Sequence, residues 1–133
     1  MAVIIYHNPR CTKSRQTLAL LTKRGIEPTI IEYLVTPPSE AELKRLLKLL
    51  GITPRELLRT KEEEYKKAKL DRPDVSDADI IRAMVKYPRL IERPIVVVTS
   101  DVQGRTSVAK GRKPRATSKA ALGRPPENVL KIL

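Results

Sequence analysis

AVIIYHNPRCTKSRQTLALLTKR, residues 2–24, predicts a strand, a turn and a helix in direct succession. The apolar run 2–6 has the composition of a buried strand, and residues 7–10 include the turn dipeptide Asn-Pro. Residues 12–24 are predicted to be helical, and the Gly25 that follows is the residue type that commonly ends a helix. A strand followed at once by a helix is the start of an α/β unit.

Cys11 is the only cysteine in the chain, and it stands at the predicted N-terminus of this helix. The first N–H groups of a helix lack intrahelical acceptors and lie at the positive end of the helix dipole, so both favour a thiolate over a thiol. The neighbouring side chains are turn-forming or basic rather than apolar: Pro9, Arg10, Lys13 and Arg15. We therefore interpret Cys11 as a nucleophile rather than as a small buried hydrophobic residue. Any redox cycle through it needs a second thiol from another molecule.

Caps, prolines and apolar periodicity predict the remaining elements. Strands are predicted over 29–34, 95–98 and 118–122. Helices are predicted to follow capping boxes at Ser39 with Glu42, Thr53 with Glu56, and Ser76 with Asp79. The first of these helices ends at Gly51 and the last ends at Pro88. A closing helix is predicted to turn Val129, Leu130 and Leu133 inward.

The order of these elements predicts the fold class. It is β-α-β, then several helices, then β-β-α, which matches an α/β protein with a thioredoxin-like mixed sheet of about four strands. The helical insertion follows the second strand and spans about residues 38–90. The unbroken β-branched run 95–98 indicates a central strand. We interpret residues 1–133 as a single domain, long enough to bury a real core.

The formal net charge of +12 indicates an anionic partner, a solvated basic surface, or both. Residues 101–117 are basic and lack periodicity, which predicts an extended loop or a mobile hairpin. No run approaches the roughly 20 apolar residues of a membrane helix, and the N-terminus lacks the pattern of a signal peptide. We therefore expect a cytoplasmic protein with no membrane partner.

Four motifs carry a resemblance to a known family. They are Tyr6-His7-Asn8-Pro9-Arg10-Cys11-Thr12-Lys13-Ser14-Arg15, Leu57-Leu58-Arg59-Thr60, Ile91-Glu92-Arg93-Pro94-Ile95-Val96-Val97 and Gly123-Arg124-Pro125-Pro126-Glu127-Asn128-Val129-Leu130. Together they resemble the glutaredoxin-coupled arsenate reductases, the ArsC family of the thioredoxin-like superfamily. The resemblance runs nearly end to end, from Val3 to Leu133. Spx-type regulators are more distant relatives with the same fold.

The resemblance implies a role for each matching residue. Cys11 matches the family's nucleophile, and Arg59, Arg93 and Arg124 match three arginines that gather around the oxyanion. A tetrahedral dianion needs several fixed donors, which the planar guanidinium supplies in pairs. The matching supporting residues are His7, Asn8, Ser14 and Pro94. The bond before Pro94 is predicted to be cis, as is usual in thioredoxin-like folds, with Arg93 pointing at the sulfur. For His7, a tuning role and an ordinary strand-end role both stay open.

The reaction implied by the resemblance is the reduction of arsenate. Cys11 thiolate attacks arsenate, oxygen leaves as water, and glutathione acts as co-substrate to reduce As(V) to As(III). Glutaredoxin then resolves the mixed disulfide. The resemblance implies no bound cofactor and no metal.

The sequence lacks the motifs of two other cysteine-dependent functions. A cysteine phosphatase loop needs arginine six positions after the cysteine, where Thr17 stands, and a Cys-x-x-Cys switch needs cysteine where Ser14 stands. Two alternatives remain: a thiol oxidoreductase of another substrate, and an Spx-like regulator that contacts RNA polymerase or nucleic acid. Residues 110–115 resemble short basic arms that enter the DNA minor groove. A solvated loop is the favoured interpretation of that segment.

Overall fold

The computed structural model describes residues 2–100 and 117–133. Its elements, in chain order, are β1 (Ala2–His7), α1 (Thr12–Lys23), β2 (Thr29–Glu32), α2 (Glu40–Leu50), α3 (Pro54–Leu57), α4 (Glu63–Lys67), α5 (Asp77–Lys86), the 3-10 helix η1 (Pro88–Leu90), β3 (Ile95–Ser100), β4 (Thr117–Leu122) and the 3-10 helix η2 (Pro126–Ile132). The sequence makes no prediction for α4, which lies in a charged segment.

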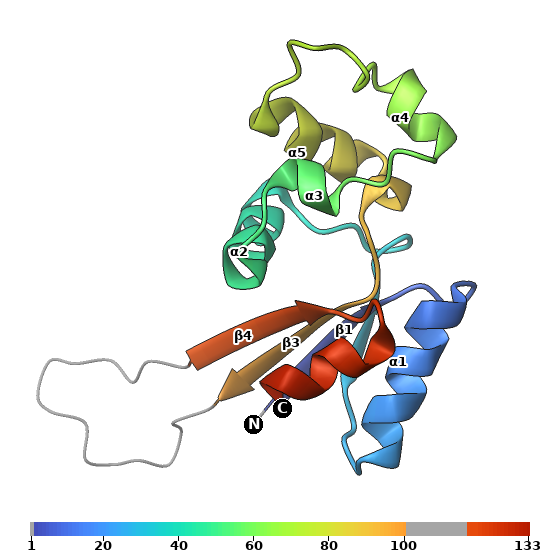
Figure 1. Ribbon diagram of the computed structural model, residues 1–133, viewed down its shortest axis with the longest axis vertical. Helices are drawn as coiled ribbons and strands as arrows, with labels where there is room; N and C mark the ends of the chain where they lie inside the picture. The colour runs from blue at the N-terminus through green and yellow to red at the C-terminus, as the bar shows by residue number, and fades with distance from the viewer. Residues whose placement is uncertain (1, 101–116) are drawn as a thin grey trace, which may run out of the picture.

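The four strands form one mixed sheet in the order β2-β1-β3-β4 (Figure 1). β1 pairs in parallel with β2 and antiparallel with β3, and β3 pairs antiparallel with β4. The predicted α/β class and the mixed sheet of about four strands are therefore confirmed. β3 has a neighbour on each side, as its unbroken β-branched sequence predicts.

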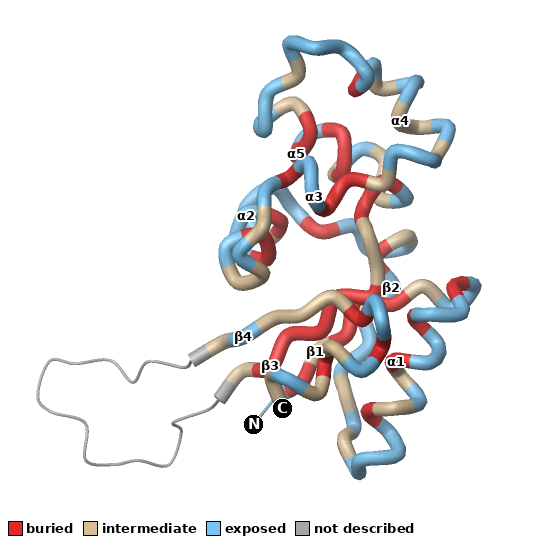
Figure 2. Tube along the Cα trace, in the orientation of Figure 1, coloured by how far each residue is buried: buried red, intermediate tan, exposed pale blue. Residues whose placement is uncertain are grey.

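Each face of the sheet packs against its own hydrophobic core. β3 turns Val96 and Val98 toward α1 and η2. It turns Ile95 and Val97 toward the helices that lie between β2 and β3 in the chain. Figure 2 shows the buried trace running along β1 and β3. The helices α2, α3, α4 and α5 gather at one end of the sheet, and the chain re-enters the sheet after η1 (Figure 1).

Local capping signals place several helix ends where the sequence predicts them. Reciprocal capping boxes form between Thr53 and Glu56 and between Ser76 and Asp79. Gly25 and Gly51 have φ of 77° and 68°, the left-handed conformation that glycine adopts at low cost after a helix.

The capping box predicted at Ser39 is incomplete. The Ser39 hydroxyl accepts the backbone N–H of Glu42, but the Glu42 carboxylate does not return to Ser39. It accepts a hydrogen bond from the hydroxyl of Tyr6 on β1 instead. A long-range partner has therefore replaced the local one.

Two predicted elements have different limits or geometry. The second strand ends at Glu32 rather than at residue 34, because the carbonyl of Glu32 accepts the N–H groups of Val35 and Thr36 in a turn. The closing helix is 3-10, and of its three residues predicted to face inward only Val129 is fully buried. Ile132 and Leu133 are partly buried and pack against the same core as Val129.

Residues 101–116 of the predicted basic loop lie outside the described residues, and β4 begins at Thr117. Among the helices of the described ranges, none has the length and apolar character needed to cross a membrane.

Candidate active site

Cys11 is the N-cap residue of α1, with extended backbone angles (φ −94°, ψ 124°). Its N–H donates to the Asn8 carbonyl (3.0 Å), and its own carbonyl accepts the N–H of Arg15 (3.0 Å). The thiol makes no capping hydrogen bond, and the residue is 9% exposed. The first turn of α1 contains no acidic residue. An anion at this helix end therefore meets backbone donors with no carboxylate of α1 competing for them.

A buried hydrogen-bond network holds the loop that carries Cys11. Nδ1 of His7 lies 2.7 Å from the Ser14 hydroxyl, which also accepts the N–H of Asn8 (3.0 Å). The Asn8 side-chain oxygen accepts the N–H of Arg10 (3.0 Å). Burial lowers the pKa of His7, although the charge of Glu32 opposes the shift. His7 is therefore neutral at neutral pH, and it joins Asn8 and Ser14 in shaping the loop without adding positive charge.

Tyr33, directly after β2, is a further buried residue whose hydroxyl is affected by this site, and the sequence pattern does not predict a role for it. The residue is 1% exposed, and burial raises the pKa of its hydroxyl. The charge of Arg59 lowers that pKa, the charge of Cys11 raises it, and a side-chain hydrogen bond with Asn8 lowers it. The hydroxyl is thus within electrostatic reach of both Cys11 and Arg59, on the side of Asn8. A buried aromatic residue after β2 carries no signal of this role in sequence.

Arg59 is placed by a short bridge between distant segments. Its backbone N–H donates to the Leu90 carbonyl (2.8 Å), and the Glu92 N–H donates to the Leu57 carbonyl (2.9 Å). These two bonds join the end of α3 to the segment that leads into β3. The bridge therefore sets the Arg59 side chain beside Glu92 and Arg93.

Arg93 and Arg124 are brought together by the contact of Pro94 with Gly123. The Gly123 N–H donates to the Pro94 carbonyl (3.0 Å), and Nη1 of Arg124 donates to the Arg93 carbonyl (3.3 Å). The predicted cis bond before Pro94 is present, and a second cis bond precedes Pro125.

Gly123 also lies against α1. A Cβ on Gly123 would be 2.4 Å from Thr17 Oγ1 and 2.8 Å from Pro94 Cγ, so only glycine fits this junction. Thr17 itself is fully buried, and its hydroxyl donates to the Lys13 carbonyl in the first turns of α1 (2.8 Å). The junction therefore ties both arginines to the helix that begins at Cys11.

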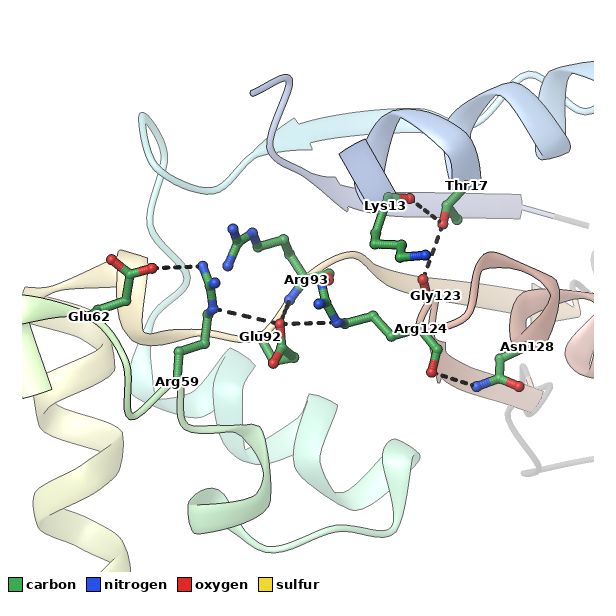
Figure 3. A network of polar contacts seen from close by, with 9 residues as sticks. All are labelled: Lys13, Thr17, Arg59, Glu62, Glu92, Arg93, Gly123, Arg124 and Asn128. Atoms are coloured by element: carbon green, nitrogen blue, oxygen red, sulfur yellow. Dashed lines mark hydrogen bonds and ion pairs between the residues drawn. The ribbon is translucent and has the colours of Figure 1, made fainter. Parts of the chain in front are cut away.

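Glu92 lies at the centre of the three arginines (Figure 3). Its Oε1 is 3.7 Å from Nε of Arg59 and 3.5 Å from Nε of Arg124, and it accepts the backbone N–H of Arg93 (3.2 Å). Glu62 forms a second ion pair with Arg59, with its Oε1 2.9 Å from Nη1. Neither glutamate is predicted from the sequence to have a role in the site. The adjacency of Glu92 to Arg93 was the available signal.

Arg93 differs from the other two arginines in its contacts. Its Nε and Nη1 are buried, and neither has a hydrogen-bond partner among the described residues. Buried polar groups are normally satisfied, and each one left without a partner costs about 1–3 kcal/mol, or more when charged. The buried donors of Arg93 therefore lack the hydrogen-bond acceptor that such groups normally have.

The structure thus gathers the eight predicted site residues into two groups that meet at α1. The first group shapes the nucleophile loop: His7, Asn8, Cys11 and Ser14. The second contains the three arginines of the cationic cluster, Arg59, Arg93 and Arg124, together with Pro94. No hydrogen bond joins Cys11 Sγ to a guanidinium group in the described ranges. Within those ranges, no group of three or more His, Cys, Asp or Glu side chains is arranged to hold a metal ion.

Comparison with known proteins gives consistent matches over the full length. Residues 6–132 match the sequence model of the ArsC family. The chain is 47% identical to the uncharacterized protein YfgD of Escherichia coli (strain K12), over 98% of this chain and 96% of that protein. It is 46% identical to an arsenate reductase of Haemophilus influenzae, over 100% of both chains. The solved structure of an arsenate reductase from Vibrio cholerae superposes with a TM-score of 0.81 at 48% identity, covering 100% of this chain and 98% of that chain. These matches confirm the predicted thioredoxin-like fold.

Proposed function

This chain belongs to the ArsC family, and from that premise we propose that it is an arsenate reductase in which Cys11 is the nucleophile. Arg59, Arg93 and Arg124 hold the oxyanion. The names of its relatives support the reaction, and the arrangement of side chains around α1 supports the roles.

The observation that carries the proposal is the buried guanidinium of Arg93. Its Nε and Nη1 lack partners in the described part of the chain, so donors on both sides of this planar group have no acceptor. The oxygens of an oxyanion that approaches in the plane of the guanidinium match such donors in charge and hydrogen bonding. A bound arsenate would therefore satisfy donors that the protein leaves without an acceptor.

The other two arginines also retain donors for a ligand. The contacts of Arg59 use its Nε and Nη1, and those of Arg124 use its Nε and Nη1. Each keeps Nη2 without a contact among the described residues. The N-terminal N–H groups of α1 supply further donors beside Cys11.

Chemistry starts at Cys11. Its thiolate attacks arsenic, an S–As bond forms, and one arsenate oxygen leaves as water after taking up two protons. The N-terminal donors of α1 and the cationic cluster stabilise the negative charge of the attacking thiolate and the bound anion. His7 and Ser14 hold the loop, and neutral His7 leaves the positive charge to the arginines.

Glutathione then supplies the second thiol, because the chain has a single cysteine. Its thiolate attacks Sγ of Cys11 in the adduct, an S–S bond forms, and the S–As bond breaks with its electron pair going to arsenic, so As(V) becomes As(III). The two sulfurs end as a disulfide between Cys11 and glutathione, which glutaredoxin resolves. A cytoplasmic location, where glutathione keeps thiols reduced, suits this cycle.

The test is NADPH-coupled reduction of arsenate by the purified protein, with glutathione, glutaredoxin and glutathione reductase. We expect turnover that depends on both added thiol components and disappears in Cys11→Ser. Arg24→Lys, at an exposed position on the other end of α1, is the control and keeps full turnover.

Two results would contradict the proposal. Turnover retained in Cys11→Ser would remove Cys11 as the nucleophile. No arsenate turnover in wild type, with Cys11 still alkylated readily by iodoacetamide, would favour a thiol oxidoreductase of another substrate.

A further inference from the structure

Glu92 makes polar contacts with all three arginines of the cationic cluster. A single oxygen, Oε1, makes the contacts with Nε of Arg59, Nε of Arg124 and the backbone N–H of Arg93. The Glu92 side chain is only 26% exposed. A carboxylate in the middle of an anion site is unexpected, because it repels the anion that the arginines attract.

We propose that Glu92 is a positioning residue that orients Arg59 and Arg124 for the oxyanion. This inference rests on the proposed function, and it concerns the same site. Glu92 does not contact the substrate; it acts through the guanidinium groups.

The donor inventory of the two arginines supports this role. Glu92 forms ion pairs with the Nε atoms of both, Glu62 pairs with Nη1 of Arg59, and the Arg93 carbonyl accepts a hydrogen bond from Nη1 of Arg124. Each guanidinium thus has a partner at two of its three nitrogens. Since the group is planar, two fixed nitrogens also fix the direction of the third. The remaining Nη2 donors are oriented before any ligand arrives.

Charge gives a second argument. Three guanidinium groups in one cluster repel one another, and long flexible side chains would separate to reduce that repulsion. Figure 3 shows the Glu92 carboxylate between the guanidinium groups of Arg59 and Arg124. The carboxylate therefore keeps the two groups together, at the cost of some attraction for the incoming anion.

These two effects of Glu92 predict opposite results for Glu92→Gln. The amide keeps the side-chain volume and an oxygen for the Arg93 N–H, but it loses the negative charge. If Glu92 only repelled the anion, its neutralisation would tighten anion binding. If Glu92 positions the arginines, binding weakens although the site has become more positive.

The experiment measures the Kd of arsenate and of inorganic phosphate by isothermal titration calorimetry, without any turnover. For Glu92→Gln we expect binding about 5- to 50-fold weaker than wild type, since misplaced donors lose most of their contribution. Glu63→Gln is the matched control: it removes one exposed carboxylate from α4, and we expect a Kd within about twofold of wild type. Equal or tighter binding by Glu92→Gln overturns the proposal.

NMR of the arginine Nε–H groups gives a readout that does not depend on ligand. In wild type the Hε protons of Arg59 and Arg124 are expected to exchange slowly with water, and in Glu92→Gln both are expected to exchange fast. Unchanged exchange of both protons overturns the proposal. If wild type binds no arsenate or phosphate, the proposed function fails, and this comparison still decides the role of Glu92.

Glu92→Asp covers the case in which the Gln variant does not fold. It keeps the charge, but a side chain shorter by one methylene cannot reach both Nε atoms while it accepts the Arg93 N–H. We expect weaker arsenate binding and faster Hε exchange on at least one arginine. Wild-type values for both would contradict the positioning role.

Discussion

Gly123→Ala tests whether the close contact of Gly123 with α1 places the arginines. The added Cβ would lie 2.4 Å from Thr17 Oγ1, 3.1 Å from Thr17 Cγ2 and 2.8 Å from Pro94 Cγ. Neither neighbour is free to move: Thr17 is fully buried and bonded to the Lys13 carbonyl, and Pro94 is a buried ring at the start of β3. Something in the junction must shift, and overpacking of this kind costs about 1–3 kcal/mol. For a chain of 133 residues that is a fall in Tm of roughly 3–12 °C.

The displacement reaches the site because Arg124 follows Gly123 directly and Pro94 follows Arg93. We expect kcat/KM for arsenate to fall about 10- to 100-fold, since a shift of the order of 1 Å in a binding group has effects of that size. Thermal unfolding followed by circular dichroism gives the stability, and the coupled assay at a temperature well below both Tm values gives the activity.

Two further variants make the result specific. Thr17→Ala removes two of the three close atoms, so in the Gly123→Ala background it restores part of the lost stability, and a double-mutant cycle measures this coupling. Gly51→Ala is the control: no atom lies within 4 Å of its Cβ, but φ is 68°, so it costs roughly 1–2 kcal/mol of backbone strain and leaves kcat/KM unchanged. Wild-type stability and activity in Gly123→Ala, or zero coupling with Thr17→Ala, would refute the reasoning.

Three other predictions concern single residues. Arg93→Lys should lower kcat/KM for arsenate about 10- to 100-fold, because a single ammonium cannot replace the separate in-plane donors of the guanidinium; wild-type values in the coupled assay would contradict the placement of Arg93. His7 is the only histidine, so its imidazole signals in a proton NMR titration should show a pKa below the ordinary 6.5, and a midpoint at or above 6.5 would contradict its burial. Because the unfolded chain protonates His7 more readily than the folded protein does, its contribution to stability is fully present above pH 6.5 and is lost as the pH falls below that value. Thr53→Ala should lower the free energy of unfolding in urea by about 0.5–2 kcal/mol through loss of the capping box of α3, whereas Thr53→Ser should keep most of it; equal losses would exclude the cap as the cause.

The secondary structure was predictable where its signal spans three or four residues. The capping boxes at Thr53 and Ser76 and the glycines at 25 and 51 depend only on local backbone and side-chain chemistry. Ser39 shows the limit of such rules. Its partner Glu42 lies on the face of α2 that meets β1, and the Tyr6 hydroxyl competes for the carboxylate. No pattern within α2 reveals that competitor.

The residues of the candidate site also differ in whether a local sequence signal identifies them. Cys11 and the three arginines were identified because each lies in a recognisable motif. Glu92, Tyr33 and Gly123 were missed because their roles depend on what lies opposite them after folding. The role of Glu92 depends on Arg59 and Arg124, which two other segments bring next to it. The role of Gly123 depends on its contact with Thr17 of α1.

The distribution of charge in the cluster bears on where the proposed oxyanion would bind. Glu92 pairs with Arg59 and Arg124, whereas Glu62 pairs with Arg59 and with Arg89 outside the cluster. Among the described residues neither carboxylate contacts the Arg93 side chain, and Glu92 reaches Arg93 only through its backbone N–H. The uncompensated charge is therefore on the Arg93 side chain, the one whose buried donors have no partner among the described residues. The N–H groups at the start of α1 supply further donors for an anion, and no acidic side chain in the first turn of α1 competes for them. Under the proposed function, a dianion that contacted both Arg93 and this helix end would lie beside Cys11. The lack of a carboxylate partner at the Arg93 side chain thus supports an oxyanion position close to the proposed nucleophile.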